Sequence, residues 1–242
     1  MLDKDVVLKQ VEAAVERAAH LDMRAHPIAL GFADGTLTLA GEVAHVGVKK
    51  AALRAAAAVP GMTGIIDRLR IDAGPTLGDG ATRDAVCRWL LRDIDFKNCT
   101  LYTLVKGQRE TLRARGPNAS GSIEVAVADG IVTLAGQVIS LSHKRLAEVL
   151  AWWARGCRDV VNALAVVPFE EDNDDEIADA MRLVLESDPY LHAERIGSSC
   201  RDHVVTLDGV VTTTGERERA ERDAWCLFAV DQVVNRIEVR AP

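Results

Sequence analysis

Residues 33–43 read ADGTLTLAGEV, and similar stretches follow at 128–138 as ADGIVTLAGQV and at 207–216 as LDGVVTTTGE. Asp-Gly is typical of a two-residue type I′ turn, because both central positions need a positive φ that Gly adopts freely and Asp tolerates. In the first two copies, apolar residues alternate along the chain on both sides of the Asp-Gly pair, as in strands with one buried face. Each stretch therefore predicts a β-hairpin, with its turn at Asp34-Gly35, Asp129-Gly130 or Asp208-Gly209.

A second signal recurs downstream of each hairpin, as IIDRLRI at 65–71, VVNALAV at 160–166 and VVNRIEV at 233–239. Its Asp or Asn follows the hairpin Asp by 33 residues in the first two copies and by 27 in the third. We therefore expect copy three to have lost six residues just after Gly215, between hairpin and helix. The segment between the two signals has the length of a helix, and such a crossover returns the chain parallel to the strand it left.

An apolar stripe with helical spacing also precedes each hairpin. The stripes are Val7, Val11, Ala14, Val15 and Ala18 in copy one, Val86, Trp89, Leu90 and Leu91 in copy two, and Ile177, Met181, Val184 and Leu185 in copy three. The repeated unit is therefore α-β-β-α-β. The sequence predicts an α+β protein of three tandem modules, each a three-stranded mixed sheet with two helices packed on one face. The alternative is one large α+β domain with chance internal similarity.

Two linkers separate these modules. DAGPTLGDG at 72–80 is rich in Gly and Pro, and PFEEDNDDE at 168–176 joins a Pro to an acidic run. We place module 1 at 1–72, module 2 at 80–168 with an insertion at about 95–121, and a shortened module 3 at 174–242. Modules of about 65 to 70 residues are near the lower limit for independent stability, so we expect them to pack on one another.

The composition argues against several classes of protein. A net charge of −7 and a pI near 5.4 disfavour broad electrostatic binding to nucleic acid. Five cysteines without a C-x-x-C pair argue against a disulfide framework or a zinc site. The first residues lack the basic and apolar regions of a signal peptide, and no run reaches the ~18 apolar residues of a membrane span. We therefore expect a cytoplasmic protein, or a periplasmic one if a leader was removed.

The repeated residues resemble the BON domain, named for bacterial osmotically inducible and nodulation proteins. The shared pattern is D-G-x-h-T-L-x-G-[EQ]-V, where h is an apolar residue, followed by a helix and the second signal. The matching residues are Asp34, Gly35, Thr38, Leu39, Gly41 and Val43, then Asp129, Gly130, Thr133, Leu134, Gly136 and Val138, and in the degenerate third copy Asp208, Gly209, Thr212 and Gly215. The resemblance implies a non-enzymatic module, typically of envelope or periplasmic proteins, that is linked to osmotic stress and attaches to phospholipid. Some cytoplasmic relatives with one such module sense potassium.

The insertion of copy two carries a local positive charge on an acidic protein. Lys106, Arg109, Arg113 and Arg115 stand against Glu110, and Arg guanidinium groups suit phosphate and carboxylate groups. We interpret this stretch as a basic loop that binds lipid headgroups, a nucleotide or an acidic partner. The alternative is a solvated loop, or one clamped onto a neighbouring module. Secondary anion candidates at equivalent positions of the second helices, which otherwise are ordinary exposed residues, are Lys49, Lys144 and Arg217.

The sequence predicts no catalytic residue, metal site or cofactor. Ser140, Ser142 and His143 lie together at the start of a predicted helix, where Ser is a natural N-cap. The acidic run at 170–176 lacks the Gly and the distal Glu of an EF-hand loop. Its carboxylates suit the positive end of a helix that begins near Asp175 and keep the linker solvated.

We therefore predict a non-catalytic binding or scaffold protein, related to stress, that contacts an anionic phospholipid surface or an acidic protein. One alternative is a cytoplasmic sensor of a small ligand or a monovalent ion such as potassium. Another is a protein-assembly module with Trp152, Trp153 or Trp225 as anchors, since aromatic residues are common at interface hot spots. Trp152 and Trp153 cannot both face one core, so one of them should be partly exposed or lie between modules. The oligomeric state stays open.

Overall fold

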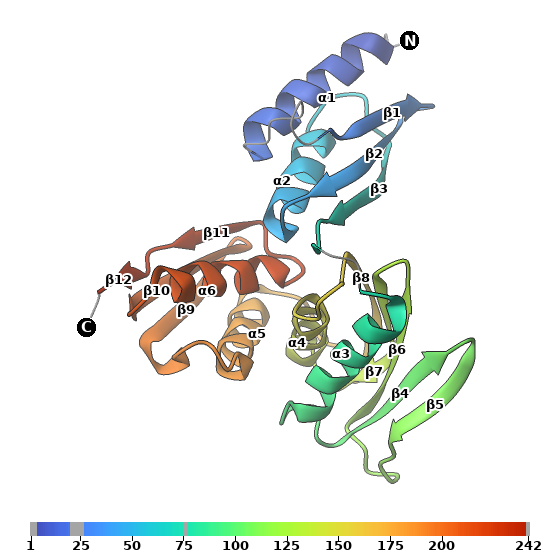
Figure 1. The fold of residues 1–242 in the computed structure, drawn as a ribbon. Helices are drawn as coiled ribbons and strands as arrows, with labels where there is room; N and C mark the ends of the chain where they lie inside the picture. Colours follow the sequence, from blue (N-terminus) through green and yellow to red (C-terminus); the bar gives the residue numbers. More distant parts are fainter. Residues whose placement is uncertain (1–3, 20–26, 75–76, 241–242) are drawn as a thin grey trace. The chain divides into compact units, whose positions relative to one another are not determined.

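The computed structural model describes residues 4–19, 27–74 and 77–240, and the chain divides into two compact units, 1–72 and 73–242 (Figure 1). The described helices and strands form three mixed sheets, each with helices packed against it, which confirms the predicted α+β class. Module 1 is the first unit. Modules 2 and 3 together make the second.

Module 1 has the α-β-β-α-β order that the sequence predicts. Its elements are α1 (Lys4–Ala19), β1 (Ala29–Ala33), β2 (Thr36–Val43), α2 (Val46–Ala57) and β3 (Gly64–Ile71). The central strand β2 is antiparallel to β1 and parallel to β3, as a hairpin followed by a helical crossover requires. Val7, Val11 and Val15 of the predicted stripe are fully buried in one core with Leu37 and Leu39.

Module 2 contains two strands more than expected. Its elements are α3 (Asp79–Arg92), β4 (Cys99–Val105), β5 (Gln108–Arg113), β6 (Gly121–Ala128), β7 (Ile131–Val138), α4 (Leu141–Trp152) and β8 (Asp159–Val166). They form a five-stranded sheet in the order β5-β4-β6-β7-β8. Ser140 caps α4 by accepting a hydrogen bond from His143 N at 3.1 Å, which confirms the predicted N-cap.

The insertion is thus a second β-hairpin and not the loop that the sequence suggested. Its turn is Lys106-Gly107, where φ is 50° and 79°, the positive values that a two-residue hairpin turn needs. The first strand, β4, pairs parallel with β6 and buries Leu101 and Thr103. The sequence of β5 lacks the alternation of apolar and polar residues that predicts a strand. The reason is that β5 is an edge strand, and most of its residues are exposed to solvent.

Module 3 is built around the strand β10, and its hairpin turn differs from the predicted one. The elements are α5 (Asp174–Ser187), a short 3-10 turn η1 (Ala193–Arg195), β9 (Ile196–Arg201), β10 (Val204–Val211), α6 (Thr214–Cys226), β11 (Gln232–Asn235) and β12 (Glu238–Val239). β9 runs antiparallel to β10, and β11 and β12 both pair parallel with it. The turn is Asp202-His203, with φ of 50° and 60°, whereas Asp208-Gly209 lies inside β10.

The corrected turn removes the expected deletion from copy three. Asn235 follows Asp202 by 33 residues, the same spacing as in the other two copies. β10 reads VVTLDGVV, so Thr206, Leu207 and Gly209 match the Thr, Leu and Gly of the repeated pattern. His203 replaces the usual Gly of the turn. The Asp-Gly pair six residues further along, at 208–209, resembles the turn signal and led to the wrong prediction.

The Gly late in each central strand is required by a close approach of two backbones. Gly136 and Gly209 have φ of 122° and 143°. A Cβ at Gly136 would lie 2.1 Å from Ser122 O, and one at Gly209 would lie 2.1 Å from Arg195 O. Only Gly fits where a neighbouring carbonyl comes so near.

The Asn of the second signal ties the last long strand to the helix before it. Asn162 Nδ2 donates to Lys144 O at 2.9 Å and to Glu148 Oε2 at 3.0 Å. In module 3, Asn235 Nδ2 makes the same two bonds, to Arg217 O and Glu221 Oε2, each at 3.0 Å. The repeated Asn is therefore a structural residue.

Candidate binding surface on module 2

The basic residues predicted to bind anions lie on the β4–β5 hairpin, and the structure engages most of them internally. Arg113 donates to the carbonyl oxygens of Cys99, Leu91 and Phe96. Arg115 Nε donates to Lys97 O at 2.9 Å. Arg113 therefore clamps the hairpin to the loop after α3, and burial, followed by the charge of Arg115, lowers the pKa of its guanidinium.

The other two predicted residues lie nearer the tip of the hairpin. Arg109 forms an ion pair with Glu124 and stacks over the Tyr102 ring at 4.9 Å, while 61% of its side chain stays exposed. Lys106 is exposed at the turn. The hairpin thus offers less free positive charge than its sequence implies, because part of that charge is used to hold the hairpin itself.

A pocket lies between α3 and the hairpin. Its volume is about 440 Å³, and it is lined by Asp84, Cys87, Arg88, Leu91, Arg92, Thr103 and Leu112. Leu91 and Leu112 are 39% and 41% exposed, and Ile94 in the loop that follows α3 is 78% exposed. Leu91 belongs to the predicted apolar stripe of copy two, but it faces outward. Module 2 therefore shows apolar side chains to solvent beside a mainly apolar hollow.

Basic side chains stand next to these apolar ones. Arg88 and Arg92 line the pocket and are exposed on α3, and neither makes an ion pair with any residue that the structure describes. Lys97 is exposed in the loop between α3 and β4. Sequence reasoning missed Arg88 and Arg92 because they precede the insertion, although their spacing of four residues places them on one side of a helix. Burial raises the pKa of the Cys87 thiol at the pocket base, so that thiol stays protonated.

The secondary anion candidates have different environments. Lys49 is 7% exposed, with an ion pair to Asp67 at 2.9 Å and a hydrogen bond to Leu69 O at 3.1 Å. The expectation that Lys49 is an ordinary exposed residue was wrong. Lys49 is buried because it pairs with Asp67, which stands where the other modules have Asn162 and Asn235. Lys144 is half-buried and lies 5.7 Å from the centre of the Phe228 ring, and of the three candidates only Arg217 is exposed.

Trp153 lies where modules 2 and 3 meet. Its ring contacts Trp89 edge to face at 5.3 Å, and its Nε1 donates to Asp223 Oδ1 at 2.8 Å. Trp152 and Trp225 are half-buried. Of the three predicted anchors, Trp153 is thus engaged in the contact between two modules of the same chain.

Two buried carboxyl groups complete this contact. Asp188 accepts hydrogen bonds from Arg219 and from Tyr190 N. Burial, and then the adjacent Asp188 carboxylate, raises the pKa of Asp223 well above its ordinary value. Asp223 Oδ2 is buried without a partner among the described residues. Protonation of Asp223 removes the repulsion between its carboxylate and the neighbouring carboxylate of Asp188.

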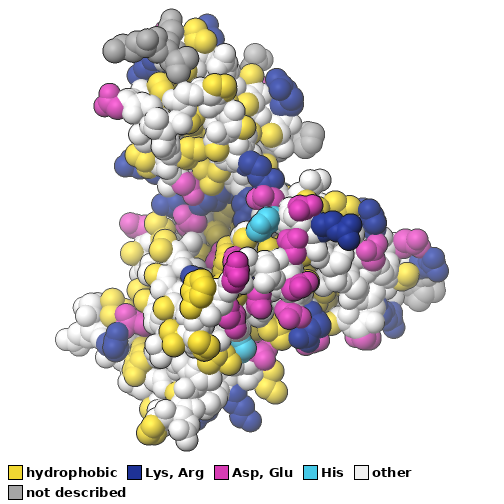
Figure 2. All heavy atoms as spheres, turned by 180° about the vertical axis from the view of Figure 1, so that it is seen from behind, with side chains coloured by type: hydrophobic (Ala, Val, Ile, Leu, Met, Phe, Trp, Pro, Cys, Tyr) yellow, Lys and Arg dark blue, Asp and Glu magenta, His cyan; other side chains and the backbone are white. Residues whose placement is uncertain are grey.

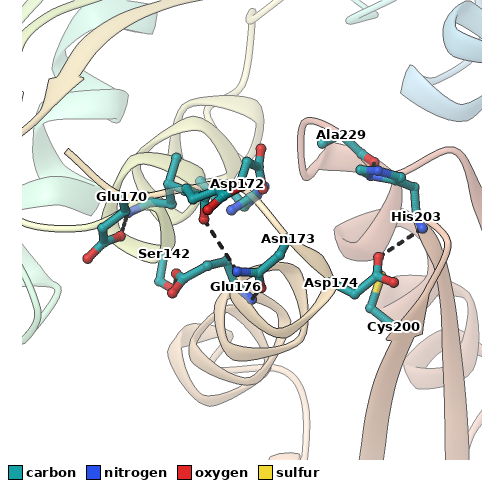
Figure 3. Close-up of polar contacts among 12 residues, drawn as sticks. Ser142, Glu170, Asp172, Asn173, Asp174, Glu176, Cys200, His203 and Ala229 are labelled. Carbon is teal, nitrogen blue, oxygen red and sulfur yellow. Dashed lines mark hydrogen bonds and ion pairs between the residues drawn. The ribbon is translucent and has the colours of Figure 1, made fainter.

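The acidic linker also serves to join modules 2 and 3. Figure 3 shows that Asp172 and Asp174 point in opposite directions, Asp172 toward α4 and Asp174 toward the module 3 hairpin. Asp172 pairs with the fully buried Arg145 of α4 at 2.5 Å. Asp174 accepts from the turn amides of Asp202 and His203 at 2.7 and 3.0 Å, which lowers the pKa of Asp174.

Acidic side chains gather on the face of the second unit that Figure 2 shows. Glu170 Oε2 accepts from Leu141 N at the start of α4 at 2.7 Å. The helix α5 begins at Asp174, with Asp174, Asp175 and Glu176 in its first turn, close to the predicted start. The expectation that these carboxylates also keep the linker solvated was incomplete, because Glu170, Asp172 and Asp174 bridge structural elements. In the parts of the chain that the structure describes, no group of three or more His, Cys, Asp or Glu side chains is arranged to hold a metal ion. Nor does any described helix have the length and apolar character to cross a membrane.

Comparisons with known proteins agree with the repeats. The family model of the BON domain matches residues 3–73, 108–168 and 173–241. Its second match begins at the first residue of β5 and leaves out α3 and β4.

Two solved structures of CdsD, a structural protein of the type III secretion system of Chlamydia trachomatis, were also found. One, of the C-terminal domain, is 13% identical, covers 99% of this chain and 100% of its own, and has a TM-score of 0.25. The other is 14% identical, covers 98% and 93%, and has a TM-score of 0.26. A comparison with curated proteins found no match. On the three family matches, which together span most of the chain, this protein belongs to the BON domain family.

Proposed function

We propose that this protein is a non-catalytic binding protein whose module 2 contacts anionic phospholipid surfaces. The family consists in general of binding modules, and we identify no candidate catalytic group among the residues that the structure describes. The observation that carries the proposal is the mixed surface between α3 and β5. Exposed Leu91 and Leu112 line a hollow of about 440 Å³ together with Arg88 and Arg92, and the exposed Ile94 follows in the loop after α3.

This combination fits the surface of a bilayer. Apolar side chains enter the boundary between headgroups and acyl chains, while neighbouring cations attract anionic headgroups. Each basic residue near such a surface contributes about 1 kcal/mol. The protein as a whole carries −7, so binding depends on the local patch, and salt should weaken it.

The test is co-sedimentation with vesicles of phosphatidylglycerol and phosphatidylcholine, compared with vesicles of phosphatidylcholine alone. The double variant Arg88→Ala/Arg92→Ala should lose about 2 kcal/mol, which is roughly a 30-fold weaker partition onto anionic vesicles. Arg222→Ala/Arg236→Ala removes the same charge from exposed positions of module 3 and should leave the partition unchanged.

The apolar part of the surface needs its own variant. Leu112→Ser keeps every charge, and it should weaken binding in high salt, where the apolar contribution is what remains. Equal binding of the two double variants would contradict the proposal. So would equal sedimentation with both kinds of vesicle, or no sedimentation in any salt.

A further inference from the structure

The outer edge of β9 is open where the matching edge in module 2 is filled. β6 and β9 are equivalent strands, since Ile123 pairs with Gly136 and Ile196 pairs with Gly209 in the same register. β6 pairs on its other side with β4, through residues 121–125. The equivalent residues, 194–198, have no strand on that side in the part of the chain that the structure describes (Figure 1).

The backbone of β9 presents hydrogen-bonding groups at this edge. Leu207 O and Val211 O accept from Arg236 N and Arg240 N, so these residues of β10 turn toward the β11 side. Peptide groups of alternate residues point to opposite sides of a strand. Asp208 therefore bonds to β9, and in β9 the N–H and C=O of Ser198 point to the open edge. In module 2, the equivalent Val125 O faces β4 and accepts from Thr103 Oγ1 at 3.3 Å.

A groove of about 650 Å³ runs between this edge and α5. Its apolar lining includes Leu185, which is the counterpart of Leu90 in α3, and Ile196. In module 2 the corresponding space is occupied by β4, whose Leu101 and Thr103 are buried there. The two modules therefore have equivalent sites beside the first hairpin strand. In module 2 this site is filled by β4, and in module 3 no described strand fills it.

The charges around the groove indicate which kind of segment it would bind. Asp179, Glu186 and Glu194 line it, with Arg182 as the one basic residue of the lining. Arg182 is paired with Glu186 at 3.1 Å, and Glu194 lies 3.9 Å from Nε of Arg195, which stands outside the lining. Asp179 has no ion-pair partner among the described residues, so the lining keeps a net negative charge next to an open strand edge, which is a surface for β-strand addition.

We propose that this groove binds an extended segment of a partner protein, which adds as a strand parallel to β9 in the way that β4 adds to β6. The segment alternates apolar residues, which enter the groove beside Leu185 and Ile196, with Lys or Arg residues that meet the acidic rim. Main-chain hydrogen bonds to Ser198 hold it in register. This site is separate from the proposed lipid surface, so the two proposals can fail independently.

The probe is a fluorescein-labelled peptide of sequence KVKVTVKVK, titrated with the full chain and followed by anisotropy. The control peptide EVEVTVEVE has the same pattern and the opposite charge. Ser198→Pro removes the N–H at the open edge, a position where a strand tolerates Pro. Ser198→Ala keeps this N–H and loses only the hydroxyl. We expect Ser198→Pro to weaken binding at least tenfold and Ser198→Ala to change it less than twofold.

Charge variants test the rim. Asp179→Lys/Glu194→Lys should weaken binding of the basic peptide at least tenfold, and Glu218→Lys, an exposed position on α6, should not. Should Ser198→Pro fold poorly, slower amide exchange of Ser198 in the wild-type chain with the peptide present supports strand addition. The proposal is overturned if the basic peptide does not saturate the chain, if it binds Ser198→Pro as well as wild type, or if Ser198 exchange is unchanged.

Discussion

Replacing Gly209 by Ala should destabilise the second unit, whereas Gly215→Ala, six residues later, should not. At Gly209, φ is 143° and a new Cβ would lie 2.1 Å from Arg195 O and 3.1 Å from Ile196 Cα. Forcing Ala into so sparsely populated a backbone region costs about 1–3 kcal/mol. Overpacking against a backbone that cannot move away adds about 1–3 kcal/mol. The expected loss of unfolding free energy is therefore about 2–6 kcal/mol.

Gly215 is a control matched in chemistry. It lies in α6, where the nearest atom to a new Cβ would be Thr213 Oγ1, at 3.8 Å. Since Ala is favoured over Gly in a helix by up to about 1 kcal/mol, Gly215→Ala should leave the unfolding free energy unchanged or raise it by that amount.

Urea unfolding followed by tryptophan fluorescence measures both changes. The four tryptophans, Trp89, Trp152, Trp153 and Trp225, all belong to the second unit, so the signal reports on that unit alone. The hairpin register described for module 3 would be refuted by the reverse result, a Gly215→Ala variant weakened by more than about 2 kcal/mol beside an unaffected Gly209→Ala variant.

Three further perturbations follow from named contacts. Asn162→Ala removes two hydrogen bonds from strand to helix and should lower the unfolding free energy by about 2 kcal/mol in the same urea assay, and a loss below about 0.5 kcal/mol would show that the repeated Asn is not structural. Arg113→Ala removes three hydrogen bonds to backbone carbonyls and should lower the unfolding free energy by about 2 kcal/mol, with faster amide exchange in β5 as a local readout that a passive loop would not give. The raised pKa of Asp223 means that its contribution to stability is complete below the unfolded pKa of about 3.9 and is lost as the pH rises through the folded pKa. Unfolding measured from pH 5 to 9 should therefore show less decline with rising pH in Asp223→Asn, whose neutral amide does not repel the carboxylate of Asp188, and an equal decline in both proteins would exclude this carboxyl as the cause.

Much of the fold could be predicted because its signals are local. Turn residues such as Asp34-Gly35, period-two strands and helical stripes each depend on a few neighbouring residues, and three repeats of them reinforce one another. The error in module 3 had the same origin. The Asp-Gly pair at 208–209 satisfies the local rule for a turn, and only the pairing of β9 with β10 shows that the chain turns at Asp202-His203. The spacing of 33 residues to Asn235 was the sequence signal that could have corrected it.

The candidate surfaces depended on contacts between distant residues. Composition revealed the basic insertion, but it could not show that Arg113 is used by carbonyls of the chain itself, or that Arg88 and Arg92 stand beside Leu112. The sequence by itself determined the family, the repeated unit and the strand and helix types, since these follow from backbone preferences and short-range periodicity. Only the tertiary structure decided which charges are free and which strand edge is open, because burial and hydrogen bonding are set by partners far away along the chain.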